Sequence, residues 1–189
     1  MLAGKTLVVG ITGGVAAHYL PELIGQLRFN YLATVFAVLT PAASRFVSQL
    51  TIAVATGTST KTDIFENLEH NPLEHIHLAG MADLVLVAPA TFDFIGKAAS
   101  GLADDPVTLL LAATTAPVLL APAMHDTMWA HPILKRNLET LKDVGYQIIP
   151  PEVGLQATGD RGEGRMASIG SILKALREAA TSIPKTTKE

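Results

Sequence analysis

Short apolar runs alternate along this chain with longer segments whose apolar residues recur at helical spacing. The runs predict five strands, at residues 5–9, 34–39, 83–88, 118–121 and 146–149. The helical segments are residues 15–29, 40–50, 94–102, 106–113, 133–144 and 169–180. Gly145 directly follows one helical stripe, as expected of a helix C-cap. Strands that alternate with helices of this length predict a single doubly wound parallel sheet with helices on both faces.

The pattern indicates one domain over residues 1–180, because no linker, repeat or low-complexity block interrupts it. Residues 181–189 form a polar tail that we expect to be frayed. The first residues run straight into a strand and make a poor signal peptide. No apolar stretch reaches the roughly 18 residues of a membrane span. We therefore expect a cytoplasmic protein with no membrane partner.

Composition narrows the function. Apolar residues make up 49% of the chain and charged residues only 16%. Either a subunit interface or alanine-rich helices would explain this surplus. The net charge of −3 gives no reason to expect a nucleic-acid partner. The chain has no cysteine, which excludes disulfides, thiolate metal sites and a cysteine nucleophile, and no metal site is predicted.

A glycine-rich turn follows the first strand, at residues 10–14, and leads through Val15 into a helix. Gly13 and Gly14 would let the backbone approach a phosphate, although simple turn chemistry explains them equally well. The spacing is not that of a dinucleotide-binding turn, and no well-placed acid follows the second strand, so a mononucleotide fits better. Thr40, after the second strand, either binds a phosphate oxygen or only caps a helix.

Residues 122–129 follow the fourth strand and read Pro-Ala-Met-His-Asp-Thr-Met-Trp. Residues at the carboxyl end of a parallel strand lie where open α/β sheets bind ligands. Met124, Met128 and Trp129 could form an apolar wall for a flat cofactor there. Residues 89–94, Pro-Ala-Thr-Phe-Asp-Phe, follow the third strand and reach the same edge.

Residues 122–129 resemble the Pro-x-Met-Asn-x-x-Met-Trp motif of the flavin-dependent cysteine decarboxylases. This family includes phosphopantothenoylcysteine decarboxylase and the enzymes that decarboxylate the C-terminal cysteine of a peptide. Residues 89–94 resemble its Pro-x-Ser-Ala-Asn-Thr motif in a Thr-x-Asp form, and residues 96–105 also match. The resemblance runs from about Lys5 to Met166 and implies a Rossmann-like, flavodoxin-like fold. The flavin prenyltransferases share this fold but lack the Met-x-x-x-Met-Trp segment.

The resemblance implies that the cofactor is FMN. Its contacts would come from Gly13, Gly14, Val15, Thr40, Thr91, Phe92, Asp93, Ala123 and Met124. Thr91 and Asp93 would reach polar atoms of the flavin while Phe92 packs near the ring. A helix N-cap is the competing interpretation of Asp93.

Residues 75–78, His-Ile-His-Leu, resemble the family's His-Ile-x-Leu, whose histidine is the catalytic base. His75 takes that position, although a histidine at the start of a helix is often structural. In the implied reaction the cysteine CH–SH unit is oxidised to a thioaldehyde. The C=S group then accepts the electrons as carbon dioxide leaves, giving an enethiolate. His75 would remove the thiol proton.

Two positions depart from the family. Residues 157–166 match a flap motif, Ala-Cys-Gly-Asp-x-Gly-x-Gly-Arg-Met, but Thr158 replaces its cysteine and precedes Gly159 and Asp160. A hydroxyl donates protons poorly, so we expect the reaction to stop at the enethiol. His125 replaces the asparagine that holds the substrate. The predicted substrate-binding residues are His125, Met128, Trp129 and Arg165, with a solvated flap charge as the alternative for Arg165.

The loss of the flap cysteine favours the peptide branch. The leading hypothesis is FMN-dependent oxidative decarboxylation of a precursor peptide ending in Cys, for aminovinyl-cysteine formation in a ribosomal peptide natural product. One alternative is phosphopantothenoylcysteine decarboxylase of coenzyme A biosynthesis, with another proton donor. A second is a non-catalytic regulatory flavoprotein homologue. The resemblance also implies a homo-oligomer, a trimer or dodecamer, with the flavin near a subunit boundary.

Overall fold

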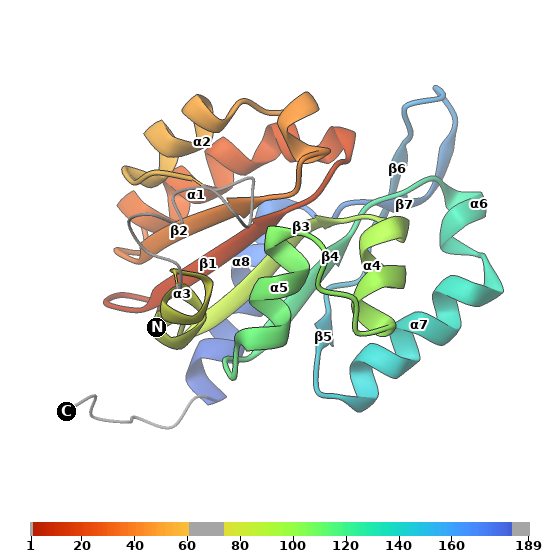
Figure 1. Ribbon diagram of the computed structural model, residues 1–189. Helices are drawn as coiled ribbons and strands as arrows, with labels where there is room; N and C mark the ends of the chain where they lie inside the picture. The colour runs from red at the N-terminus through yellow and green to blue at the C-terminus, as the bar shows by residue number, and fades with distance from the viewer. Residues whose placement is uncertain (1, 61–73, 183–189) are drawn as a thin grey trace.

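A five-stranded parallel sheet forms the centre of the molecule (Figure 1). The structure, a computed structural model, describes residues 2–60 and 74–182. The strands are β1 (Thr6–Ile11), β2 (Thr34–Leu39), β3 (Leu84–Ala90), β4 (Val118–Pro122) and β5 (Gln147–Ile148), in the order β2-β1-β3-β4-β5. Each neighbouring pair is parallel. The predicted doubly wound sheet is confirmed.

Helices cover both faces of the sheet (Figure 1). The first face carries η1 (Val15–Tyr19), α1 (Leu20–Phe29), α2 (Gln49–Thr56) and α8 (Ile169–Ser182). The second carries α3 (Glu74–Met81), α4 (Phe92–Ala99), α5 (Pro106–Ala113) and α7 (Pro132–Asp143). Along β1, Leu7 and Val9 enter the first core whereas Val8 enters the second. Strands buried on both sides explain the continuous apolar runs in the sequence.

Within the described ranges, no helix combines the length and apolarity that crossing a bilayer requires.

The predicted helix at residues 40–50 is wrong. A 3-10 turn, η2 (Ala43–Arg45), follows β2, and α2 begins only after Ser48, whose side chain accepts a hydrogen bond from the Thr51 N–H at 3.0 Å. Gly57, at φ +71°, ends α2 in the left-handed region. These cap residues, rather than the apolar content, set the helix boundaries. The predicted helix at residues 15–29 also begins differently, with η1 preceding α1.

An antiparallel hairpin, β6 (Glu152–Leu155) and β7 (Arg161–Arg165), contains most of the predicted flap segment, and the sequence analysis predicted no strands there. The hairpin docks on the segment after β4, where the Met124 N–H donates to the Gly164 carbonyl at 2.9 Å. Gly164 has φ +135°, and a Cβ there would contact the Met124 carbonyl oxygen. A glycine is therefore required for this close approach.

Glu152 joins the hairpin to the start of α8. Its carboxylate accepts hydrogen bonds from the Ser168 N–H and the Ser171 hydroxyl, both at 2.9 Å. The Ser168 N–H bond is the main cause that lowers the pKa of Glu152 from its ordinary value of 4.5. A lowered pKa in the folded state stabilises the fold above pH 4.5, and this contribution disappears as the pH falls through the lowered value.

We expect Glu152→Gln to reduce the free energy of unfolding at pH 7 by about 1 kcal/mol, the usual contribution of a helix cap. Below the lowered pKa, wild type and variant should become equally stable. Urea denaturation across this pH range measures both effects. Glu139→Gln, which removes an exposed ion pair with Lys142, is the matched control and should change little. An equal loss of unfolding free energy in both variants would contradict the stabilising role assigned to the Glu152 carboxylate.

Candidate active site

One cavity of about 780 Å³ opens at the carboxyl edge of the sheet. It lies at the boundary between β1 and β3, where the connections that follow the two strands run to opposite sides of the sheet. Sheets with this strand order bind ligands at this switch point. Loops after β1, β2, β3 and β4 line it together with the β6–β7 hairpin. This size is typical of sites for cofactors and small substrates.

The glycine-rich turn forms one wall of the cavity. A Cβ on Gly13 would lie 2.5 Å from the Ala42 Cβ, and a Cβ on Gly14 would lie 3.2 Å from the Thr91 side chain. The loops after β1, β2 and β3 can therefore converge only because these positions carry no side chain. Val15 and Thr40 line the same wall.

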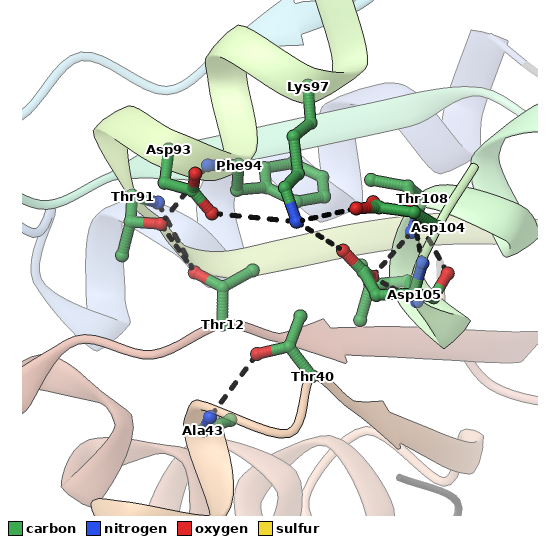
Figure 2. Close-up of polar contacts among 11 residues, drawn as sticks. Thr12, Thr40, Ala43, Thr91, Asp93, Phe94, Lys97, Asp104, Asp105 and Thr108 are labelled. Carbon is green, nitrogen blue, oxygen red and sulfur yellow. Dashed lines mark hydrogen bonds and ion pairs between the residues drawn. The ribbon is translucent and has the colours of Figure 1, made fainter. Parts of the chain in front are cut away.

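Threonine hydroxyls connect these loops (Figure 2). The buried Thr12 donates to the Pro89 carbonyl at 2.6 Å and accepts from the Thr91 N–H at 3.3 Å. Thr91 in turn accepts from the Phe94 N–H at 3.4 Å and so caps α4. The alternative interpretation of Asp93 as this N-cap is therefore wrong. Sequence analysis missed Thr12, although its place in the turn between the glycines was a usable signal.

Thr40 is buried, and its hydroxyl accepts a hydrogen bond from the Ala43 N–H at 3.2 Å in the turn that leads into η2. The N-cap of η2 is Ala42, so Thr40 stabilises this turn without being the cap of the helix that the sequence predicted at residues 40–50. Since Thr40 also lines the cavity, contact with a bound phosphate stays a prediction.

Lys97 and three carboxylates form the opposite wall (Figure 2). The Lys97 Nζ lies 3.1 Å from Asp104, 3.8 Å from Asp105 and 3.9 Å from Asp93. The hydrogen bond to Asp104 is the main cause that raises the pKa of Lys97, opposed by its partial burial. The carboxylates outnumber the ammonium, so this wall repels anions. An anionic group of a bound cofactor or substrate would be favoured at the glycine wall instead.

The segment after β4 divides between the cavity and the core. Ala123, Met124, His125 and Met128 line the cavity. Trp129, in α6 (Asp126–Trp129), is not among the lining residues: it is only 9% exposed and belongs to the core on the α7 side of the sheet. The Lys135 Nζ lies 3.9 Å from its ring centroid. The predicted apolar wall is therefore made by methionines without the tryptophan.

The hairpin contributes residues of both strands and of its turn to the cavity, including Arg165 and Gln156. The three predicted flap residues, Thr158, Gly159 and Asp160, lie exposed at its tip and are not among the lining residues. The tip is a turn in which the Gln156 N–H donates to the Asp160 carbonyl at 2.8 Å.

His75 lies in the first turn of α3, half-buried and outside the cavity lining. Helix α3 packs against α5, and the contact given between them joins the Ala79 carbonyl to the Thr114 hydroxyl at the C-terminal end of α5, 3.4 Å apart. The N-cap of α5, Asp105, is at its other end and belongs to the acidic wall. Within one chain, His75 does not line the cavity.

The chain belongs to the Flavoprotein family, whose pattern matches residues 1–181. This range includes every residue that lines the cavity. The fold and the site together thus define a flavoprotein, and the predicted cofactor class is confirmed.

Among sequenced relatives, the chain is 42% identical over 177 residues to the coenzyme A biosynthesis bifunctional protein CoaBC of Haemophilus influenzae. The match covers 94% of this chain but 44% of the relative, so the chain spans less than half of that protein. A Cys-to-Ser mutant of PPC decarboxylase complexed with pantothenoylaminoethenethiol is 32% identical, with a TM-score of 0.84 and coverage of 94% of this chain and 99% of that one.

The FMN-dependent cysteine decarboxylase SpaF is 30% identical, with a TM-score of 0.81 and coverage of 95% of this chain and 99% of that one. The chain is thus similar in structure to a PPC decarboxylase and to an FMN-dependent cysteine decarboxylase. The relatives in coenzyme A biosynthesis favour the alternative hypothesis over the peptide hypothesis.

Proposed function

We propose that the protein binds FMN and decarboxylates the cysteine of phosphopantothenoylcysteine. The observation that carries the proposal is the cavity at the β1/β3 switch point, which combines an anion-tolerant glycine wall with an apolar methionine wall. The 42% identity to a coenzyme A biosynthesis protein supports this substrate over a peptide.

The lining residues fit FMN. Gly13 and Gly14 let the loops after β1, β2 and β3 converge into one wall, away from the carboxylates, and Thr40 lies on that wall; the phosphate would bind there. Phe92 and Met124 offer apolar contacts to a flat ring. Thr91 and Asp93 offer hydrogen-bonding groups to its polar edge. Val15 and Ala123 complete the proposed contacts.

FMN, when bound, supplies the two-electron oxidation that turns the cysteine CH–SH unit into an electron sink for decarboxylation. His75 removes the thiol proton. Arg165 and His125 lie on the cavity side that the hairpin covers and bind the substrate carboxylate, while Met128 packs against the substrate chain. The hairpin excludes water from the reacting group.

A homo-oligomer would complete this site. His75 lies outside the cavity of its own chain, so a second copy is needed if His75 is to reach substrate. Leu50 and Val54, one turn apart on α2, are 74% and 73% exposed and form an apolar surface suited to such contact. The number of subunits, three or twelve, stays a prediction.

A peptide ending in Cys is the second candidate substrate, and Thr158 is the observation that favours it. The absence of a thiol at the hairpin tip suits an enzyme whose product is the enethiol itself.

Mass spectrometry of the purified holoprotein with each substrate tests the proposal. We expect phosphopantothenoylcysteine to lose about 44 mass units, the mass of carbon dioxide, because the two electrons taken from the substrate are returned to the product. A loss of about 46 mass units from a Cys-terminal peptide, with no reaction of phosphopantothenoylcysteine, would favour the second candidate. If flavin is bound but neither substrate changes, the protein is a regulatory homologue. The serine analogue, which has no thiol to oxidise, is the control.

A further inference from the structure

We infer that His125, paired with Asp126, is the acid that protonates the substrate α-carbon after carbon dioxide has left. This inference rests on the proposed function. It assigns to His125 the proton donation for which the Thr158 hydroxyl is unsuited. It starts from an unusual pair of neighbours at the cavity wall.

The two side chains lie close enough to share a proton. The His125 Nδ1 is 2.8 Å from the Asp126 Oδ1. That oxygen is buried and has no hydrogen-bond partner among the described residues. A buried carboxylate oxygen without a donor is costly, so a proton on Nδ1, brought into line by a small side-chain rotation, would satisfy it.

The hairpin lies against the other oxygen of Asp126, whose side chain is otherwise partly exposed. Strand β7 packs against α6, and a Cβ at Gly162 would lie 2.6 Å from the Asp126 Oδ2. The glycine brings the β7 backbone directly over the carboxylate. Asp126 is therefore held beside the imidazole by the same hairpin that covers the cavity.

Nδ1 also has a second set of partners, which defines the deprotonated state. As the N-cap group of α6, Nδ1 accepts a hydrogen bond from the Thr127 N–H at 3.3 Å. It also lies 2.9 Å from the Thr127 hydroxyl oxygen. An unprotonated Nδ1 accepts from Thr127, whereas a protonated Nδ1 donates to Asp126. Both states are accommodated without moving the backbone.

Nε2 is the ring nitrogen left for the substrate. The ring lines the cavity, and no described residue hydrogen-bonds to Nε2. With Asp126 holding the Nδ1 proton, Nε2 carries the second proton and pairs with the substrate carboxylate. When carbon dioxide leaves, the carbon that carried it stays next to this N–H group.

The proton transfer balances. The Nε2–H bond breaks and a C–H bond forms at the α-carbon, while the enethiolate C=C–S⁻ becomes a CH₂–CH=S thioaldehyde. The hydride removed in the first oxidation returns to the thioaldehyde carbon, and the proton that His75 took returns to sulfur, giving the saturated thiol. Nε2 then regains a proton from solvent. The net change is loss of carbon dioxide, and no further oxidant or reductant is consumed.

Other charged or titratable side chains of the cavity do not take this role. They are His18, Tyr19, Asp93, Lys97, Asp104, Asp105 and Arg165. The Tyr19 ring packs against that of His18, with centroids 3.8 Å apart. Lys97 is held by its three carboxylates, and Arg165 does not give up its proton. The His18 Nδ1 lies 2.6 Å from the Val15 carbonyl, on the glycine wall.

The test compares wild type with His125→Asn and Asp126→Asn. Asparagine also caps helices well, so thermal unfolding and flavin retention should not change in His125→Asn. We expect the ratio of saturated thiol to enethiol product to fall by about 100-fold or more in His125→Asn. Asp126→Asn should show an intermediate ratio.

A second readout needs no turnover. Phosphopantothenoylserine keeps the carboxylate but cannot be oxidised at sulfur. Calorimetric titration in buffers of different ionisation enthalpy should detect proton uptake when it binds wild type, and none when it binds His125→Asn, because a bound carboxylate favours the charged imidazole.

Unchanged proton uptake in His125→Asn, or an undiminished yield of saturated thiol, would overturn the inference. Wild-type enzyme that releases only the enethiol would overturn it while leaving the decarboxylase proposal intact. Wild-type enzyme that changes neither substrate would overturn both.

Discussion

Replacing His75 by Asn should lower kcat for phosphopantothenoylcysteine by about 100- to 10,000-fold, the usual contribution of a positioned general base. Asparagine is similar in size but cannot accept the thiol proton. Helix α3 should stay folded because the substitution lies in its first, half-buried turn. Product formation by mass spectrometry and flavin absorbance measure the two effects separately.

His77→Asn is the matched control. His77 lies two residues further along the same helix, where a side chain points to a different side, and it is exposed. The kcat of the His77→Asn variant should stay near that of wild type. Equal losses in the two variants would indicate a general disturbance of α3 and contradict the assignment of His75 as the base.

The position of His75 outside its own cavity gives the variant a further use. Mixing His75→Asn subunits with subunits that cannot bind flavin would create oligomers in which an intact His75 adjoins an intact cavity. Recovery of activity would support a site shared between copies. No recovery after verified subunit exchange would mean that His75 acts on its own chain.

Gly13→Ala should weaken FMN binding by about 10- to 100-fold. The added Cβ would lie 2.5 Å from the Ala42 Cβ and 3.1 Å from the Ala42 carbonyl carbon, so one of the two loops must move. Overpacking of this kind costs about 1–3 kcal/mol. Because both loops line the glycine wall, the movement would change the proposed phosphate site. Quenching of flavin fluorescence on rebinding to the apoprotein measures the Kd.

Gly25→Ala makes the same chemical change away from the cavity. Gly25 lies within α1, and a Cβ there would meet no atom within 4 Å. Its FMN affinity should equal that of wild type, while the free energy of unfolding should rise by about 0.5–1 kcal/mol because alanine favours the helix. An unchanged Kd in Gly13→Ala would argue against a phosphate at this wall.

Much of the architecture could be predicted from the sequence because the strands are buried on both faces. Residues 34–39 and 106–113 were predicted with the boundaries that β2 and α5 have. The helix at residues 40–50 was wrong because apolar content was weighed above the cap residues Ser48 and Gly57. The hairpin was missed because its alternating glycines and charges carry no strand pattern.

The candidate site was predicted best where loops directly follow strands. Gly13, Thr40, Thr91 and Met124 line the cavity because the carboxyl ends of parallel strands share one edge. Trp129 could not be placed in this way. Whether it faces the cavity or the core depends on how α7 packs, and its ring meets the core.

The sequence by itself determined the parallel sheet, the loops that meet at its edge and the flavoprotein resemblance, because these follow from local patterns of burial and from motifs. Only the tertiary structure decided which side chains meet across those loops. Lys97 of α4 reaches Asp104 in the loop before α5, and the β7 backbone lies over Asp126 beside His125. Such contacts depend on how separate elements pack against one another, which no local pattern of residues specifies.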